Sequence, residues 1–139
     1  MSMSLSQAET EIYKRVGAFA FAGLDKTDIR IENQPLVGGQ PYVPPTDKPW
    51  CKVTVQYADS LIAGIASGVC IRDQGIINIQ CFTPNNKGTL VMTQLCDAWR
   101  SFLQSFGVSH LEVYKVHAPQ SMDEKNFYAK IVRAEFRIN

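Results

Sequence analysis

The sequence predicts an α+β domain, in which an antiparallel or mixed β-sheet of about four to five strands carries two α-helices packed on one face. Two segments place apolar residues at helical spacing, and five segments alternate apolar and polar residues. These segments follow one another in the order α, β, β, β, α, β, β. A length of 139 residues suits one domain, so we expect a single domain over 1–139.

The first helix is expected over 6–22, because apolar residues recur there at intervals of three and four. Ser6 and Glu9 have the spacing of a capping box, and Gly23 suits the position just after a helix. Residues 28–32 then alternate isoleucine with charged residues, which is typical of a short, half-buried strand.

Residues 33–49 form a Pro-rich arm that holds five of the seven prolines and a Gly-Gly pair. Prolines lack the backbone N–H that a strand or helix needs, yet this segment is too apolar for a solvated linker. Two interpretations stay open. The segment is a loop that wraps the domain and covers the sheet, or it is an arm that contacts another subunit.

Two alternating segments, 50–58 and 76–82, predict an antiparallel pair of strands. In the second strand, alternation places Ile77 and Ile79 on one face and Asn78 on the other. Residues 60–71 between them are small and Gly-punctuated, so they form either a flexible excursion or a continuation of the hairpin. Residues 72–75 are expected to form a turn.

The second helix is expected over 90–106, capped by Thr89 and ended by Gly107. We place its inward stripe on apolar residues at helical spacing, Val91, Leu95, Ala98, Phe102 and Phe106, and expect Met92, Trp99 and Leu103 to widen this stripe. Two further strands are expected over 111–116 and 127–138, joined by a polar connection.

Composition excludes several classes of protein. The formal net charge is +1, which gives no bulk electrostatic attraction to nucleic acid or to an acidic membrane. No apolar run approaches the roughly 20 residues of a membrane span, and the first residues lack the pattern of a secretory signal. We therefore expect synthesis in a cytoplasm, with four buried free thiols at Cys51, Cys70, Cys81 and Cys96.

The motifs of catalysis are missing from the sequence. It contains no Gly-rich phosphate loop, no nucleophile elbow and no metal-binding His pair on a helix. None of the possible Cys–His pairs is favoured over the others. The acids are scattered, and we expect solvated carboxylates at Asp25, Asp28, Glu32, Asp59, Asp73, Asp97 and Glu112. The sequence thus predicts no enzyme, no metal and no cofactor.

The C-terminal stretch 115–139 carries five basic residues against three acids, a local balance of +2. This pattern is typical of the solvated face of an ordinary strand. A second interpretation is the weakly positive lining of a ring or channel that meets a phosphate backbone in passing, and Arg133 and Arg137 are the residues we would place on such a face.

An ordered series of motifs resembles the phage tail terminator family. A helix leads into the segment 31–36, then into a Pro-rich connection that closes on Lys48, Pro49 and Trp50, and then into a strand. The strand that follows, Gly75-Ile76-Ile77-Asn78-Ile79, ends in Phe82-Thr83-Pro84 and precedes Gly88 and an amphipathic helix. The resemblance covers about residues 5–107.

The resemblance implies a structural virion protein without enzymatic activity. Such a subunit assembles as a homo-hexameric ring, ends polymerisation of the tail tube, and joins the tail to the neck or head connector. Its partners are other copies of itself, the tail tube protein and a neck or head-completion protein, with DNA passing transiently through the ring and no membrane. The expected location is the tail–neck junction of the virion, after assembly in the host cytoplasm.

A ring needs two different complementary patches on each subunit. The first candidate patch lies on the arm and consists of Leu36, Tyr42, Val43, Pro44, Pro45 and Trp50, although a core position for Trp50 is an open alternative. The second lies either on the exposed side of the strands, with Phe82, or at the tip formed by Arg72, Asp73 and Gln74. Two other classes remain open: another neck or head-completion ring protein, and a small cytoplasmic protein-binding module.

Overall fold

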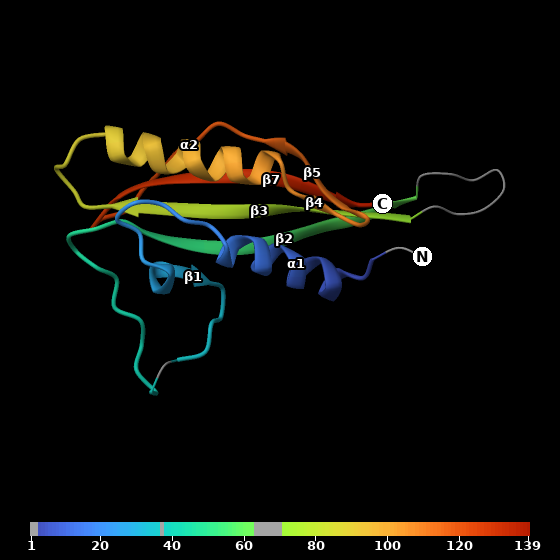
Figure 1. Cartoon of the computed structure of the whole chain (residues 1–139), viewed down its shortest axis with the longest axis horizontal. Coiled ribbons are helices and arrows are strands. Elements are labelled where there is room, and N and C mark those ends of the chain that lie inside the picture. Colours follow the sequence, from blue (N-terminus) through green and yellow to red (C-terminus); the bar gives the residue numbers. More distant parts are fainter. Residues whose placement is uncertain (1–2, 37, 63–70) are drawn as a thin grey trace.

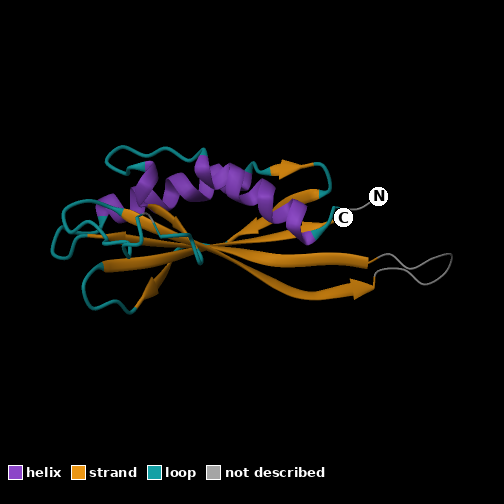
Figure 2. Cartoon of the chain, turned by 90° about the horizontal axis from the view of Figure 1, so that it is seen from below, coloured by secondary structure: helices purple, strands orange, loops and turns teal. Residues whose placement is uncertain are grey.

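Two helices lie on one face of a strongly twisted, curled sheet (Figure 2). The computed structural model describes residues 3–36, 38–62 and 71–139. The helices are α1 (Leu5–Gly17) and α2 (Leu90–Gln104), with a short 3-10 helix, η1 (Lys26–Asp28), between α1 and the sheet. The strands are β1 (Ile29–Ile31), β2 (Trp50–Ile62), β3 (Ile71–Thr83), β4 (Gly107–Val108), β5 (Leu111–Val116), β6 (Gln120–Met122) and β7 (Tyr128–Ile138).

The sheet is mixed and has seven strands in the order β1-β2-β3-β7-β5-β4, with β6 paired to β7 off this path. Strand β1 runs parallel to β2, and the other pairs are antiparallel. The prediction of four to five strands is therefore wrong, although the protein is still α+β. The strands β4 and β6 have two and three residues, too few to produce a detectable alternation of apolar and polar residues.

The hairpin of β2 and β3 is longer than predicted, and each strand has 13 residues. The turn predicted over 72–75 is wrong, because these residues are in β3, where Gln74 and Gly75 pair with β2 on one side and β7 on the other. Asp73, for example, lies opposite Ile138 of β7. Pairing on both sides overrides the local turn propensity of the Arg-Asp-Gln-Gly sequence. Part of the predicted excursion, residues 63–70, lies outside the described residues.

Helix α1 begins and ends earlier than predicted. Its N-cap is Ser4, whose side chain accepts from the backbone N–H of Gln7, while the Gln7 side chain accepts from the Ser4 backbone N–H. This capping box replaces the predicted pair of Ser6 and Glu9. The helix ends at Gly17, and Gly23 instead lies in a turn with a φ of 88°.

Helix α2 is buried along most of the predicted stripe, but not at Val91. Its fully buried residues are Met92, Leu95, Cys96, Trp99 and Leu103, whereas Val91 is 44% exposed, so the prediction for Val91 is wrong. The indole of Trp99 anchors this stripe, because it stacks on Phe19 with ring centroids 3.6 Å apart. The two helices are joined further by Arg15, which donates to the carbonyl of Phe102 at 2.8 Å.

Three of the four cysteines lie in the core, as predicted. Cys51, Cys81 and Cys96 are free and have no exposed surface, and Cys70 lies outside the described residues. The indole N–H of Trp99 donates to the sulfur of Cys51 at 3.4 Å. Hydrogen bonding with the neighbouring thiols, together with burial, raises the pKa of Cys81, so this thiol stays protonated. These cysteines act as small apolar core residues.

Candidate functional site

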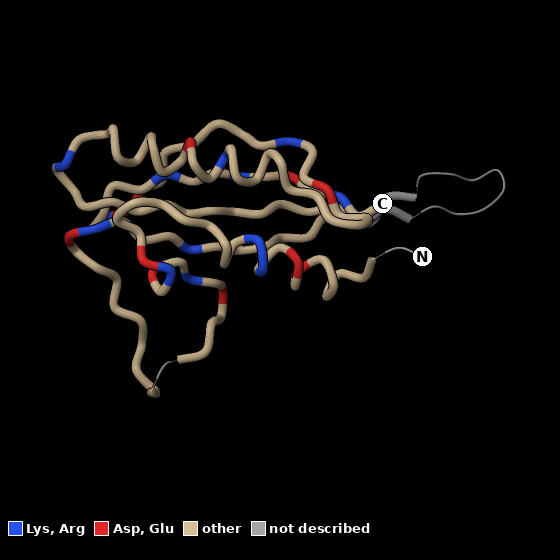
Figure 3. The backbone as a smooth tube through the Cα atoms, viewed as in Figure 1, with Lys and Arg blue, Asp and Glu red and all other residues tan. Residues whose placement is uncertain are grey.

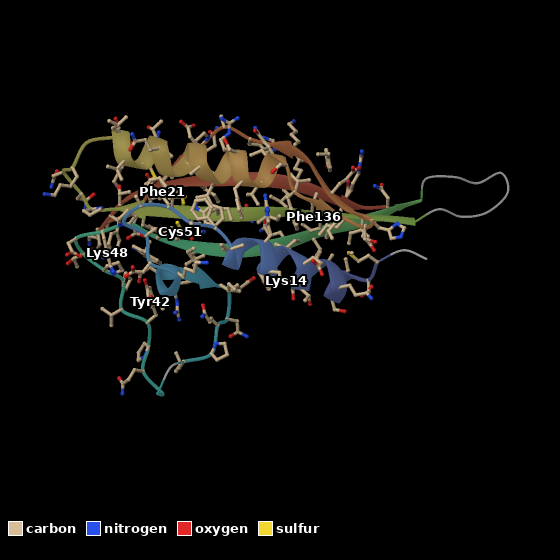
Figure 4. All side chains as sticks on the ribbon, in the orientation of Figure 1. Lys14, Phe21, Tyr42, Lys48, Cys51 and Phe136 are labelled. Atoms are coloured by element: carbon tan, nitrogen blue, oxygen red, sulfur yellow. The ribbon has the colours of Figure 1, made fainter. Side chains whose placement is uncertain are left out.

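The Pro-rich arm leaves the domain as a long projection and returns to the start of β2 (Figure 1). At its base, the arm is fastened by Tyr42 and Lys48, whose side chains both turn back toward η1 and β1 (Figure 4). Farther out, Leu36 is 59% exposed and Val43 is 81% exposed. The predicted arm patch thus divides into a part that holds the arm and a part that faces outward.

Asp28 is the centre of the polar contacts at the base of the arm. Its side chain is only 10% exposed, and its Oδ1 accepts a 2.7 Å hydrogen bond from the Tyr42 hydroxyl. The Nζ of Lys48 lies 3.3 Å from Oδ2 of Asp28 and also contacts Asp25. The prediction of a solvated carboxylate at Asp28 is therefore wrong. We call Asp28, Tyr42, Lys48 and Arg30 the arm clamp, because the Arg30 guanidinium lies 4.2 Å above the Tyr42 ring.

A cluster of aromatic rings continues from the clamp onto the face of the sheet without helices. Trp50 stacks on Phe82 with ring centroids 4.1 Å apart, and Phe127 meets both rings edge-on. Tyr42 lies 5.8 Å from Trp50 and links this cluster to the clamp. Phe82 is only 4% exposed, so it packs within the subunit and offers little contact surface. Trp50 is half-buried, so both its predicted interface role and the alternative packing role stay open.

The remaining predicted residues lie on β3, on β7 and in the arm. Asp73 and Gln74 are half-buried in β3, and only the backbone of Arg72 is described. On β7, Arg133 is exposed, whereas Arg137 pairs with Glu112 and lies 5.0 Å from the Tyr114 ring. Pro44 and Pro45 are half-buried in the arm.

Charge is concentrated at the base of the arm and is missing from its projecting part (Figure 3). Residues 33–46 contain no acid and no base, whereas the segment from Asp25 to Glu32 contains five charged residues. An uncharged projection with two exposed aliphatic side chains has the composition of an interface core. The sequence contained this signal, but which apolar residues face outward depends on contacts with Asp28 and Trp50.

No cluster of three His, Cys, Asp or Glu side chains suited to a metal occurs within the described ranges. A groove of about 480 Å³ lies beside α1, and its walls are Met3, Ser6, Gln7, Thr10, Glu11, Ser109 and His110. None of the predicted site residues lines this groove. Within the described part of the chain, no helix has the length and apolar character needed to cross a membrane.

Replacing the central carboxylate of the arm clamp tests how much the clamp contributes to stability. We expect Asp28→Asn to lower the free energy of unfolding by about 2 kcal/mol, because a buried acceptor for a phenol and an ammonium loses its charge. Asp25→Asn is the matched control, since Asp25 contacts the same Lys48 but is 64% exposed. Urea unfolding of both variants measures the difference. An equal loss of unfolding free energy in the two variants would mean that the buried carboxylate stabilises the fold no more than the exposed one.

Ionisation of tyrosine gives a second test of the packed arm. Burial and the hydrogen bond to Asp28 raise the pKa of Tyr42 well above 10.0, and burial and Glu9 do the same for Tyr57. A pKa that is higher in the folded state stabilises the fold while the phenol is protonated. The free energy of unfolding should therefore be insensitive to these groups below about pH 10 and should fall as the pH rises above it. Tyr42→Phe should remove part of this fall in urea unfolding curves recorded at several alkaline pH values; an unchanged fall would contradict the assignment.

Comparison with known proteins supports the fold alone. No protein-family model matches the sequence, and no curated protein matches it. Eight solved protein chains match the structure. One of them, whose name states no function, superposes with a TM-score of 0.68 at 15% sequence identity, over 99% of this chain and 96% of its own. At this level of identity the two proteins share an architecture, and nothing about activity or partners follows.

Proposed function

We propose that this chain is a structural phage virion protein that assembles as a homo-hexameric ring, ends polymerisation of the tail tube, and joins the tail to the neck or head connector. The observation that carries the proposal is the arm: a clamped base supports an uncharged projection on which Leu36 and Val43 are exposed. An apolar surface held in one orientation loses little conformational entropy on association.

The order of motifs along 5–107 supplies the second support, because it resembles the tail terminator family. A protein of this kind acts mechanically. It stops the tube by binding the last ring more tightly than another tube subunit does, and no bond is made or broken. We place it at the tail–neck junction of the virion, with copies of itself, the tail tube protein and a neck protein as partners and with DNA passing transiently through the ring.

Mass in solution and tube length test the proposal together. Native mass spectrometry at two concentrations should give a hexamer, or a monomer that forms rings on the ends of tubes made from the tail tube protein. Added during polymerisation, the protein should shorten the tubes, and electron microscopy should show a ring at one end. A fixed dimer at both concentrations that leaves tube length unchanged would overturn the proposal.

Two other results would favour the alternatives. A stable ring that does not bind tube ends would favour another neck or head-completion protein, which binds a different partner. A monomer that neither assembles nor changes tube length would favour a small protein-binding module.

A further inference from the structure

One border of the sheet is left open by a mismatch in strand length. Strand β2 has 13 residues, but β1 pairs only with Cys51, Lys52 and Val53. On its other side, β2 pairs with β3 along nearly its whole length. From Thr54 onward, no strand of the described part of the chain pairs with the outer side of β2. In Figure 2, the end of the β2–β3 hairpin beside the grey segment extends beyond both helices.

The pairing pattern identifies the backbone groups that point outward. The backbone N–H of Glu32 donates to the carbonyl of Val53 at 3.1 Å, so Val53 presents its backbone groups to the β1 side. Alternate residues of a strand present their N–H and C=O groups to the same side. Val55 and Tyr57 therefore point theirs away from the sheet, while Thr54 and Gln56 point theirs to β3.

Open edges are usually protected against pairing by charges, prolines, bulges or covering segments. The outer side of β1 is capped, because the N–H of Ile31 donates to the Gln34 side chain at 3.0 Å and its carbonyl accepts from the Gln34 N–H. On the opposite border, β5 has an irregularity between Val113 and Lys115. The edge from Thr54 to Ala58, by contrast, is uncharged and free of proline, and the irregularity of β2 begins only after Ala58.

We propose that this open edge of β2, Thr54–Ala58, is the pairing site for an extended segment of a second copy of this chain. The inference rests on the proposed function, because a ring brings a neighbouring copy against each subunit and requires contacts of defined register. Backbone pairing supplies that register through the outward N–H and C=O groups of Val55 and Tyr57. Association then protects an edge that would otherwise invite uncontrolled pairing.

A proline at position 57 tests the edge directly. Tyr57→Pro removes the outward N–H, and a strand edge tolerates proline where the N–H points away from the sheet. Tyr57→Ala is the matched control: it loses the same side-chain contacts, including the 2.7 Å hydrogen bond to Glu9, but keeps the N–H. We expect Tyr57→Pro to raise the concentration at half-assembly at least about tenfold over Tyr57→Ala, since one interface hydrogen bond is lost and the strand is blocked. Equal assembly of the two variants at equal thermal stability would overturn the inference.

Amide hydrogen exchange on the unmodified protein gives an independent readout. On assembly, exchange at Val55 and Tyr57 should slow at least about tenfold, while Thr54 and Gln56, already paired to β3, should change little. Unchanged exchange at Val55 and Tyr57 in a protein that forms rings would overturn the edge inference and leave the proposed function standing. Slowed exchange in a fixed dimer would support edge pairing and overturn the ring.

Discussion

Gly75→Ala is expected to destabilise the fold severely, although it adds only one methyl group. A Cβ at position 75 would lie 2.3 Å from the carbonyl oxygen of Gln56 and 2.6 Å from the ring of Phe136. The first atom belongs to the backbone of a paired strand and the second to a ring without exposed surface, so neither has room to move. We expect a loss of about 3 kcal/mol or failure to fold.

Gly17→Ala is the control for this prediction. Nothing lies within 4 Å of a Cβ built there, and the residue is the last of α1. Alanine should leave stability unchanged or raise it by up to about 1 kcal/mol, because it restricts the unfolded chain and favours the helix. Thermal melts of the two variants decide the point. Similar melting temperatures would show that the sheet yields around Gly75.

If the chain assembles as the proposed ring, replacing both exposed aliphatic residues of the arm, Leu36→Ser with Val43→Ser, is expected to weaken that assembly by about a hundredfold or more. Burying a leucine or valine at an interface contributes about 1.5–3 kcal/mol each. Both side chains are largely exposed in the single subunit, so replacing them removes few contacts within it. The melting temperature of the dissociated subunit should therefore stay unchanged. Native mass spectrometry across a dilution series measures the change in assembly.

Leu90→Ser provides the control for the arm, because Leu90 is 67% exposed at the start of α2 and has a similar apolar surface. It should leave assembly unchanged. If Leu90→Ser dissociates the ring and the arm variant does not, then the helix face and not the arm holds neighbouring subunits together.

Residue alternation alone predicted which side chains of the long strands share a face. Ile77 and Ile79 in β3 lie on one face, as the pattern indicated, and both are fully buried in the core. Asn78, expected on the opposite face, donates from its side-chain amide to the side chain of Gln56 on β2 at 3.0 Å. These assignments succeed because the side-chain period of a strand is a local property of the backbone.

Sequence reasoning failed where a residue's environment comes from distant parts of the chain. Asp28 looked like a solvated acid, and only its contact with Tyr42, fourteen residues later, buries it. Gly75 looked like a turn residue, and only pairing with β2 and β7 shows why a side chain is not tolerated there. Val91 has the spacing of a core residue, but the stacking of Trp99 on Phe19 sets the rotation of α2 and leaves Val91 exposed.

The sequence by itself determined the α+β class, the two helices, the faces of the main strands and the existence of an uncharged, Pro-rich arm. These follow from local periodicity and composition, which each segment carries without reference to the rest of the chain. Only the tertiary structure decided which aromatic residues of the arm are anchors and which aliphatic residues face outward, and that β2 extends beyond β1 to leave an open edge. Such features depend on long-range contacts and strand register, which no local pattern encodes.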